Sequence, residues 1–345
     1  MLSKMLKLAI TISTAALLGC ASKPGPVFPP IENPPTFPLP PEPPRVRYVG
    51  SLMSDVDLKP SVNGFESIGR AIFGKHPPKE MVSPYALCTD GGNRLFVADS
   101  NAQVVHVFDL RTRKYAAWTP EKKKKFSQPV GIAPDGAGGV FVSDSVAGDI
   151  VHLDEGGSLV ARIGAGVVSR PCGMAYDGKN DRLYVADSEL HQIIILDKTG
   201  KLLARLGSRG MEHGKFNFPT NVALDSQGRL YVSDSLNFRI QQFGPDFAFI
   251  RQIGKKGDMP GYFSQPKGIA VDCDDHLYVV DANFEAVQIF DGNGRLLLDF
   301  GQEGRAPGEF WLPAGIFIDA NNRIWIADSY NRRVQAFDYL PEVKP

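Results

Sequence analysis

Six aspartates recur at nearly constant spacing, and they offer the most obvious chemistry in the chain. They are 45, 43, 47, 47 and 47 residues apart and stand at Asp99, Asp144, Asp187, Asp234, Asp281 and Asp328. A ring of carboxylates could hold a metal ion or exchange protons. However, an Asp that directly follows an apolar run commonly accepts backbone N–H bonds in the next turn. Because the same residue stands in every repeat, a structural role is favoured over a single active site.

The histidines and the other acidic residues do not form a recognisable metal-binding pattern. His76, His106, His152, His191, His213 and His276 occupy different positions of the repeat. Their spacing therefore supports neither a zinc collar nor a Ser-His-Asp arrangement. Four residues from Asp272 to Asp275 are rich in carboxylates, but no complete calcium loop follows them. We predict no metal, no cofactor and no catalytic residue.

Four cysteines fall into two groups. Cys20 stands near the N-terminus, and Cys88, Cys172 and Cys273 lie in three different repeats. Because three is an odd number, these three cannot all form disulfides with one another. Cys88 replaces a small apolar residue and is expected to be buried, whereas Cys172 follows a proline and could be exposed. No Cys-x-x-Cys-His motif is present, so covalent haem is not supported.

Cys20 ends a segment with the features of a secretion signal. Lys4 and Lys7 precede an uncharged apolar run at 8–18, which is too short to span a bilayer but suits a signal peptide. The run ends in Leu-Leu-Gly-Cys at 17–20, which resembles the lipobox of bacterial lipoproteins. That resemblance implies removal of residues 1–19 and attachment of acyl chains such as palmitate to Cys20. Because Ala21 follows, it also implies outer-membrane sorting in a Gram-negative cell.

A proline-rich segment follows the proposed lipid anchor. Eleven prolines lie between 23 and 44. Such sequence favours extended polyproline II, about 3.1 Å per residue. We interpret residues 20–44 as the lipidated Cys and a semi-rigid spacer, with a recognition motif for a polyproline-binding partner as the alternative.

Charge excludes one class of partner. The chain has 38 Lys and Arg against 38 Asp and Glu. Removing residues 1–19 takes away Lys4 and Lys7 and no acids, which leaves 36 against 38 and a formal charge of −2. Binding to nucleic acid normally rests on a basic footprint, so a nucleic-acid partner is not expected.

The residues around the six aspartates recur as a unit. Each repeat has a run that begins with proline, an apolar run that ends at the aspartate, and one or two further apolar runs. Four short strands per ~45 residues is the period of a propeller blade. The segments at 234–239 and 328–333, with the Gly-rich loops at 254–263 and 301–310, resemble NHL repeats. The chain is therefore expected to be an all-β, six-bladed β-propeller of the NHL type over 84–340, and a monomer.

The ring needs a strand from outside the repeats to close. The sixth repeat stops after its third strand, and the residues at 45–52 read like the missing fourth one. Its addition would remove an open sheet edge. Within the same region, 45–83, Phe65, Ile68, Ile72 and Phe73 have helical spacing after Asn63, which predicts a short helix before blade 1. We expect it to pack on the rim, with a partner-binding plug as the alternative.

One aromatic per blade is expected in the core. These residues are Phe96, Phe141, Tyr184, Tyr231, Tyr278 and Trp325. Small residues on the next blade would receive them, such as Gly131, Ala133, Gly173, Ala175, Gly268, Ala270 and Gly315.

Function should lie where the repeats differ. Antiparallel order places the residue after each lead proline and the residue two beyond each repeated Asp on the same rim. The polar members of this ring are our candidate binding residues: Tyr85, Asn101, Cys172, Glu189, Lys267, Asn283 and Tyr330. The favoured function is a binding or scaffolding module in the cell envelope for a protein, peptide or glycan. The alternative is a propeller enzyme, a lyase, lactonase or hydrolase, that uses the same funnel.

Overall fold

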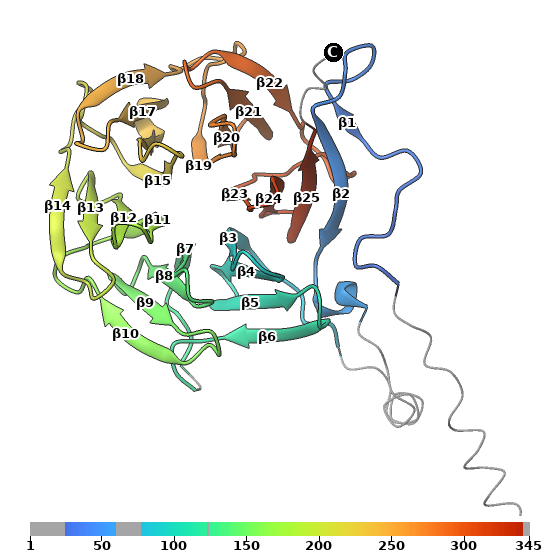
Figure 1. Ribbon diagram of the computed structural model, residues 1–345, viewed down its shortest axis with the longest axis horizontal. Helices are drawn as coiled ribbons and strands as arrows, with labels where there is room; N and C mark the ends of the chain where they lie inside the picture. Colours follow the sequence, from blue (N-terminus) through green and yellow to red (C-terminus); the bar gives the residue numbers. More distant parts are fainter. Residues whose placement is uncertain (1–24, 60–76, 123, 341–345) are drawn as a thin grey trace, which may run out of the picture.

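The computed structural model describes residues 25–59, 77–122 and 124–340, and it shows six antiparallel sheets around a central axis (Figure 1). The predicted all-β, six-bladed propeller is confirmed. In these ranges no helix is long and apolar enough to cross a membrane. The predicted helix at 65–73 and Cys20 both lie outside the described residues.

Each of the first five blades has four consecutive strands, the first of them nearest the axis. Blade 1 contains β3 (Pro84–Thr89), β4 (Arg94–Asp99), β5 (Val104–Asp109) and β6 (Lys114–Trp118). Blade 2 contains β7 (Pro129–Pro134), β8 (Val140–Asp144), β9 (Asp149–Leu153) and β10 (Leu159–Ile163). Blade 3 contains β11 (Pro171–Asp177), β12 (Arg182–Asp187), β13 (Gln192–Leu196) and β14 (Leu202–Leu206). Blade 4 contains β15 (Pro219–Leu224), β16 (Leu230–Asp234), β17 (Arg239–Phe243) and β18 (Phe249–Ile253), with a short 3-10 helix η2 (Ser235–Asn237). Blade 5 contains β19 (Pro266–Val271), β20 (Leu277–Asp281), β21 (Ala286–Phe290) and β22 (Leu296–Phe300).

Blade 6 joins the two ends of the described chain. It contains β23 (Ile316–Ile318), β24 (Arg323–Asp328), β25 (Arg333–Tyr339) and, as predicted, an N-terminal fourth strand β2 (Val46–Leu52). Val46 pairs with Tyr339 and Leu52 with Val334, so β2 runs the full length of β25. A 3-10 helix η1 (Asp55–Leu58) follows β2. Closure by the N-terminal strand satisfies the backbone groups that the last blade would otherwise expose.

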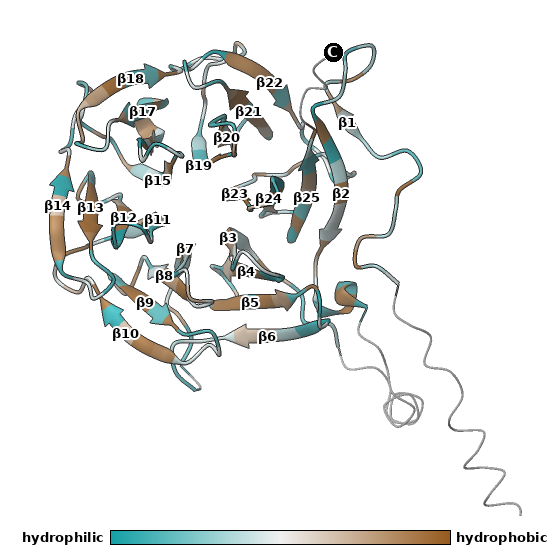
Figure 2. Cartoon of the chain, in the orientation of Figure 1, coloured by the Kyte–Doolittle hydropathy of each residue, from teal (hydrophilic) through white to brown (hydrophobic). Residues whose placement is uncertain are grey.

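The once-per-blade aromatics form the core between the blades, as expected. Figure 2 shows hydrophobic residues concentrated on the middle strands, such as β5, β13 and β21. Phe96 and Tyr278 are fully buried, and Trp325 is 2% exposed. Trp325 belongs to the cluster between blades 6 and 1, which also contains Leu87 and Phe108. These side chains therefore hold the blades together and leave nothing of the aromatic rings for a ligand.

The small residues of the inner strands have a more specific cause than the one predicted. A Cβ on Gly131 would lie 2.0 Å from the carbonyl oxygen of Cys172, and a Cβ on Gly315 would lie 2.5 Å from that of Tyr85. Each carbonyl belongs to the inner strand of the next blade. The glycines are thus required by the close approach of neighbouring backbones, not by the aromatic side chains.

The proline-rich segment differs from the expected free spacer in its described part. β1 (Thr36–Phe37) pairs with β2 as a fifth strand of blade 6, and Phe37 lies 5.4 Å from Phe300 between ring centroids. Nearer the N-terminus, Phe28 lies 6.0 Å from Trp325. Proline lacks a backbone N–H donor, but the aromatic residues between the prolines can still pack against the propeller. Burial of their rings favours the docked segment over an extended chain in water. Residues 25–44 are therefore a strap on the propeller, which we call the N-terminal strap.

Candidate functional site

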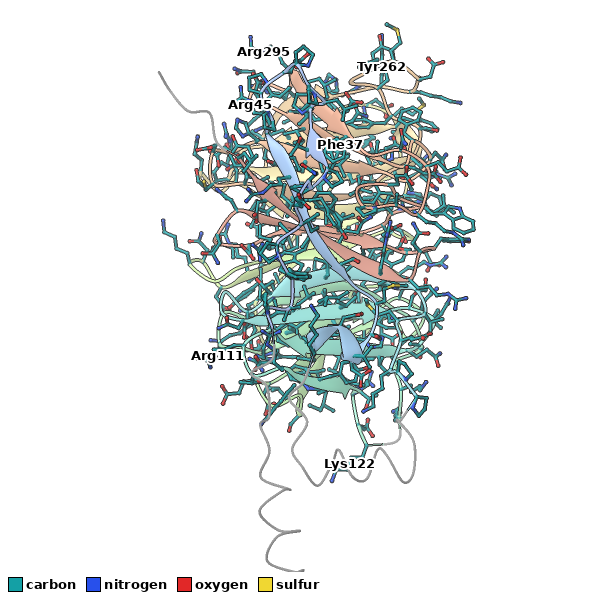
Figure 3. The ribbon with its side chains drawn as sticks, turned by 90° about the vertical axis from the view of Figure 1, so that its right-hand side faces the viewer. Phe37, Arg45, Arg111, Lys122, Tyr262 and Arg295 are labelled. Carbon is teal, nitrogen blue, oxygen red and sulfur yellow. The ribbon has the colours of Figure 1, made fainter. Side chains whose placement is uncertain are left out.

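The strand registers define two faces of the ring. Pro84 pairs with Asp99, and Pro266 pairs with Asp281, so the starts of inner strands and the ends of second strands share one face, which we call the rim face. The opposite face carries the hairpin turns between the first and second strands, and we call it the hairpin face. In the side view of Figure 3, Tyr262 projects from the rim face and Arg111 from the opposite side. The predicted co-location of the candidate residues on one rim follows from this register.

The repeated aspartates serve the blades, as the sequence favoured. Asp99, Asp234, Asp281 and Asp328 are fully buried. Asp281 accepts the backbone N–H groups of Ser264 and Gln265 at 2.7 and 2.9 Å, which ties the incoming loop to the end of β20. The backbone N–H groups of Ser127 and Gln128 donate to Asp144 in the same way. A carboxylate held by such bonds is a structural clamp.

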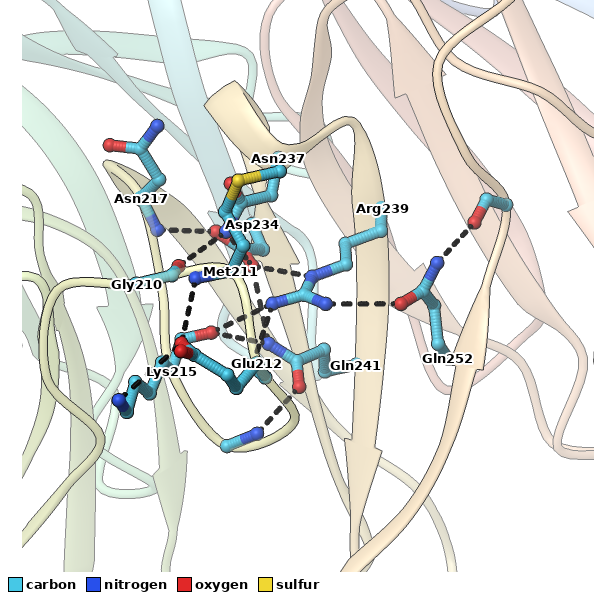
Figure 4. A network of polar contacts seen from close by, with 12 residues as sticks. Gly210, Met211, Glu212, Lys215, Asn217, Asp234, Asn237, Arg239, Gln241 and Gln252 are labelled. Carbon is cyan, nitrogen blue, oxygen red and sulfur yellow. Dashed lines mark hydrogen bonds and ion pairs between the residues drawn. The ribbon is translucent and has the colours of Figure 1, made fainter.

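Blade 4 extends this clamp with an arginine (Figure 4). Arg239 Nε donates to Asp234 Oδ2 at 2.8 Å, and its Nη2 donates to the carbonyls of both Glu212 and Lys215 at 3.0 Å each. Gln241 also donates to the carbonyl of Lys215, at 2.8 Å. The network fixes the Gly-rich loop before β15, so its polar residues are fully used in holding that loop.

The five histidines within the described residues lie in separate places, and three of them are bonded to an acid. His106 hydrogen-bonds Asp99, His152 hydrogen-bonds Asp135, and His276 hydrogen-bonds Asp272. Among the described residues, no three His, Cys, Asp or Glu side chains are grouped so that they could hold a metal ion.

Three of the seven predicted residues lie at the mouth of the central channel. Tyr85, Cys172 and Lys267 each occupy the second position of an inner strand, in β3, β11 and β19, and all are half-buried. Lys267 Nζ lies 5.7 Å from the centroid of the Tyr85 ring, although the two belong to blades 5 and 1. These side chains therefore reach past blade 6 and meet above the channel.

Burial changes the acidity of this group of three. It raises the pKa of Tyr85 to about 12, with a further contribution from Cys172, and it raises the pKa of the Cys172 thiol. It lowers the pKa of Lys267 from its usual range, against the opposing effect of Asp281. Within the described residues, Lys267 Nζ makes no hydrogen bond or ion pair. At neutral pH the mouth thus holds a neutral phenol, a neutral thiol and an amine available to a ligand.

The other four predicted residues are exposed and lie outside this mouth group. Three of them, Asn101, Glu189 and Asn283, stand in the turns after the second strands. Glu189 Oε2 accepts a hydrogen bond from Ser169 Oγ at 2.9 Å, and the Asn283 amide donates to Ser264 Oγ. Tyr330 is 59% exposed and packs 5.6 Å from Trp311. The structure does not bring these four into contact with one another, so they form an outer ring around the mouth.

Below the mouth, the channel forms an apolar cavity of about 330 Å³. Its wall comes from inner strands of all six blades and includes Leu87, Ile132, Met174, Ile269 and Ile316. A site that combines apolar walls with a few polar groups at one end is typical of small-molecule and peptide recognition. The mouth group stands at the rim end of this cavity, since Tyr85 and Cys172 directly precede the lining residues Ala86 and Gly173.

A second hollow joins the predicted Tyr330 to residues that the sequence did not point to, such as Trp311. About 590 Å³ lie between Met53, Trp311, Tyr330 and the arginines that follow Tyr330. Arg305 lies over the Trp311 ring at 5.0 Å. Trp311 stands two residues before the lead proline of blade 6, where blades 2, 3 and 5 carry serine, so its departure from the repeat is the signal that could have marked it.

Two family models match parts of the chain. A model described as a 6-bladed beta-propeller matches residues 272–340, and the NHL repeat model matches residues 216–243. The second match falls on blade 4, where the arginine clamp is complete. The chain therefore contains NHL-repeat sequence within a six-bladed propeller. No curated protein matches the sequence significantly.

Solved structures with the same fold have varied functions. Hydrazine synthase of Kuenenia stuttgartiensis is 14% identical, with 76% of this chain and 97% of that chain covered and a TM-score of 0.54. A catalytically inactive virginiamycin B lyase from Staphylococcus aureus with quinupristin is 15% identical, with coverages of 75% and 95% and a TM-score of 0.55. An auxiliary nutrient binding protein from Bacteroides thetaiotaomicron is 14% identical, with coverages of 75% and 69% and a TM-score of 0.58. At these identities the similarity shows the fold alone.

Proposed function

We propose that this protein is a bacterial lipoprotein of the NHL-propeller type, a binding module tethered to the cell envelope through acyl chains on Cys20. Its partner is a protein, peptide or glycan that engages the rim face. The tether rests on the sequence of residues 1–20: two lysines, an eleven-residue apolar run and the Leu-Leu-Gly-Cys ending. Ala21 after the Cys supports the outer membrane as its location in a Gram-negative cell.

The observation that carries the binding role is the mouth group of Tyr85, Cys172 and Lys267. A half-buried amine that makes no hydrogen bond or ion pair within the described residues costs the free protein stability, and binding of a ligand acceptor group would recover part of that cost. Here it stands beside a phenol hydroxyl, above an apolar cavity. This arrangement suits a ligand with a carboxylate or another acceptor group at the mouth and an apolar part below it.

The solved propellers support this proposal in general terms. They include an auxiliary nutrient binding protein and a virginiamycin B lyase with quinupristin, so the same fold has been used both for binding and for catalysis. For the enzyme alternative, a lyase-, lactonase- or hydrolase-like activity in the funnel, no observation in the described residues speaks in favour. Of the described histidines, His106, His152 and His276 are bonded to acids, His191 accepts the backbone N–H of Phe218, and His213 stacks on Phe249.

Labelling with palmitate tests the tether. Cells that express the full chain should incorporate label into the protein, and the Cys20→Ser variant should lose it. Label that remains in Cys20→Ser would contradict the lipid anchor.

A charge swap tests the binding surface. Lys267→Glu with Glu189→Lys keeps the net charge and should abolish crosslinking to the native partner in intact envelopes. The matched control, Lys198→Glu with Glu155→Lys, swaps two exposed charges in hairpin-face turns and should leave crosslinking unchanged. If the Lys267 and Glu189 swap crosslinks to the partner as well as the control does, the rim face is the wrong surface. A stoichiometric metal in the purified protein would instead favour the enzyme alternative.

A further inference from the structure

The N-terminal strap is attached to the propeller at several points along its length. Gly50 leaves room for Phe28, because a Cβ there would lie 2.4 Å from the Phe28 ring. Gly308 similarly leaves room for Phe37. The backbone of Pro35 accepts the N–H of Tyr48 at 2.9 Å. Together with the pairing of β1 and β2, these contacts hold residues 27–37 along blade 6.

The described end of the strap lies where blades 6 and 1 meet. Arg113, in the turn between β5 and β6, donates to the carbonyls of Gly25 and Leu58 at 3.3 and 3.1 Å. Lys59 Nζ donates to the carbonyl of Pro26 at 3.2 Å. The turn also contains Arg111, which Figure 3 shows on the side opposite Tyr262. The chain therefore reaches its described start at the hairpin-face edge of blade 1.

This position limits the reach of the proposed tether. Only residues 21–24 separate Cys20 from Gly25, so the two Cα atoms are at most about 17 Å apart, even in a fully extended chain. A free spacer over 20–44 would have allowed roughly 75 Å at the polyproline rise. Docking of the strap thus removes most of the distance that the proline content suggests.

The same edge carries a group of basic residues, whose positive charge the nearby Asp57 and Asp109 offset only in part. Four basic residues surround the start of the strap: Lys59, Arg111, Arg113 and Lys114. None of them makes an ion pair with an acid among the described residues. The nearby Asp109 carboxylate accepts the backbone N–H groups of Arg111 and Thr112, and its negative charge offsets one of the four positive charges. Basic residues close to an anionic lipid surface each contribute about a fivefold gain in membrane partitioning.

We propose that the hairpin-face edge of blade 1, at Lys59, Arg111, Arg113 and Lys114, lies against the lipid headgroups and directs the rim face away from the membrane. This inference rests on the lipid anchor of the proposed function. The occupant of the edge is an anionic lipid surface, because the tether is too short for a folded partner to be inserted between them. The mouth group is then open to partners outside the membrane plane.

Depth-dependent quenching tests the orientation. A dye is attached through p-azidophenylalanine at Thr112, beside the strap, or at Asp258, on a rim-face loop; both residues are exposed. The acylated full-length protein is placed in vesicles of phosphatidylcholine and phosphatidylglycerol that contain a headgroup quencher. We expect at least fivefold stronger quenching at 112 than at 258. Equal quenching, or stronger quenching at 258, would overturn the proposal.

Two variants separate the tether from the charges. A 20-residue Gly-Ser insertion after Ala21 should bring the two quenching values close together, and an unchanged ratio would contradict the role of the short tether. Lys59→Gln, Arg111→Gln and Lys114→Gln together should remove the extra quenching at 112 that phosphatidylglycerol gives over pure phosphatidylcholine. No difference between the two lipids in the parent protein would overturn the headgroup contact.

The outcomes distinguish this inference from the proposed function. The mass of the N-terminal peptide shows directly whether Cys20 is acylated. An unacylated peptide would refute the anchor and, with it, the orientation. An acylated peptide with equal quenching at 112 and 258 would refute the orientation alone.

Discussion

Arg239→Met is the sharpest test of the view that the repeated aspartates are clamps. Arg239 has a side chain only 6% exposed and pairs with the fully buried Asp234. The variant removes one partner of a buried ion pair, which typically costs about 3–5 kcal/mol because the other charge stays buried. Arg295 offers a matched control, since it makes the same kind of bond to Asp291 but is 78% exposed. Arg295→Met should cost less than about 1 kcal/mol.

Urea unfolding followed by circular dichroism gives both free energies. A local readout comes from trypsin: without Arg239 the carbonyl of Glu212 loses this donor and the carbonyl of Lys215 keeps only Gln241, so cleavage after Lys215 should become faster. Burial raises the pKa of Asp234 and Arg239 opposes that rise, so the variant's pKa should be higher still. A carboxyl whose pKa is raised in the folded state destabilises the protein at pH values above that pKa. The stability lost in Arg239→Met should therefore become smaller as the pH falls through the folded-state pKa of Asp234. If Arg239→Met costs no more than Arg295→Met, the clamp account is wrong.

Three further outcomes are expected. Phe28→Ala should lower the free energy of unfolding by about 1–2 kcal/mol and speed amide hydrogen exchange in β1 and β2. Ile31 is 41% exposed, so Ile31→Ala should change neither quantity. The hydrogen bond to Asp272 raises the pKa of His276, so the stabilisation by His276 is complete below about pH 6.5 and is lost as the pH rises through the folded-state pKa. In the His276→Gln variant the melting temperature should therefore change less with pH over that interval. Lys267→Met should stabilise the protein by about 1 kcal/mol in urea unfolding while it weakens partner binding, and a loss of both would contradict the role of an unpaired ligand-binding amine.

Most of the fold was predictable because it follows from periodicity. The repeat length predicted four-stranded blades. Because the sixth repeat ends at Asp338 without a fourth strand, it also predicted that residues 45–52 supply that strand. Repetition also separated the structural Asp234 from a site residue. The strap was not predictable in this way. Its prolines suggested an extended chain, and the two small positions that admit Phe28 and Phe37, Gly50 and Gly308, lie far away in the sequence.

The candidate site was predictable in its face but not in its geometry. Strand order alone placed Tyr85 and Lys267 on one rim. It could not show that their side chains meet across blade 6, because that depends on how tightly the inner strands approach at residues such as Gly315. It also could not show that Tyr330 packs against Trp311 at the outer ring, since the repeat fixes the backbone of Trp311 through Asp328 but not the direction of its side chain.

Photo-crosslinking at two asparagines tests the central claim, binding at the rim mouth, most directly. A photoreactive residue replaces Asn101 on the rim face or Asn293 in a hairpin-face turn, both exposed, in the full chain in its native envelope. We expect a discrete crosslinked species from position 101 that disappears in the Lys267→Met background, and none from position 293. Crosslinking that is equal at both positions, or that persists at 101 without Lys267, would contradict the account.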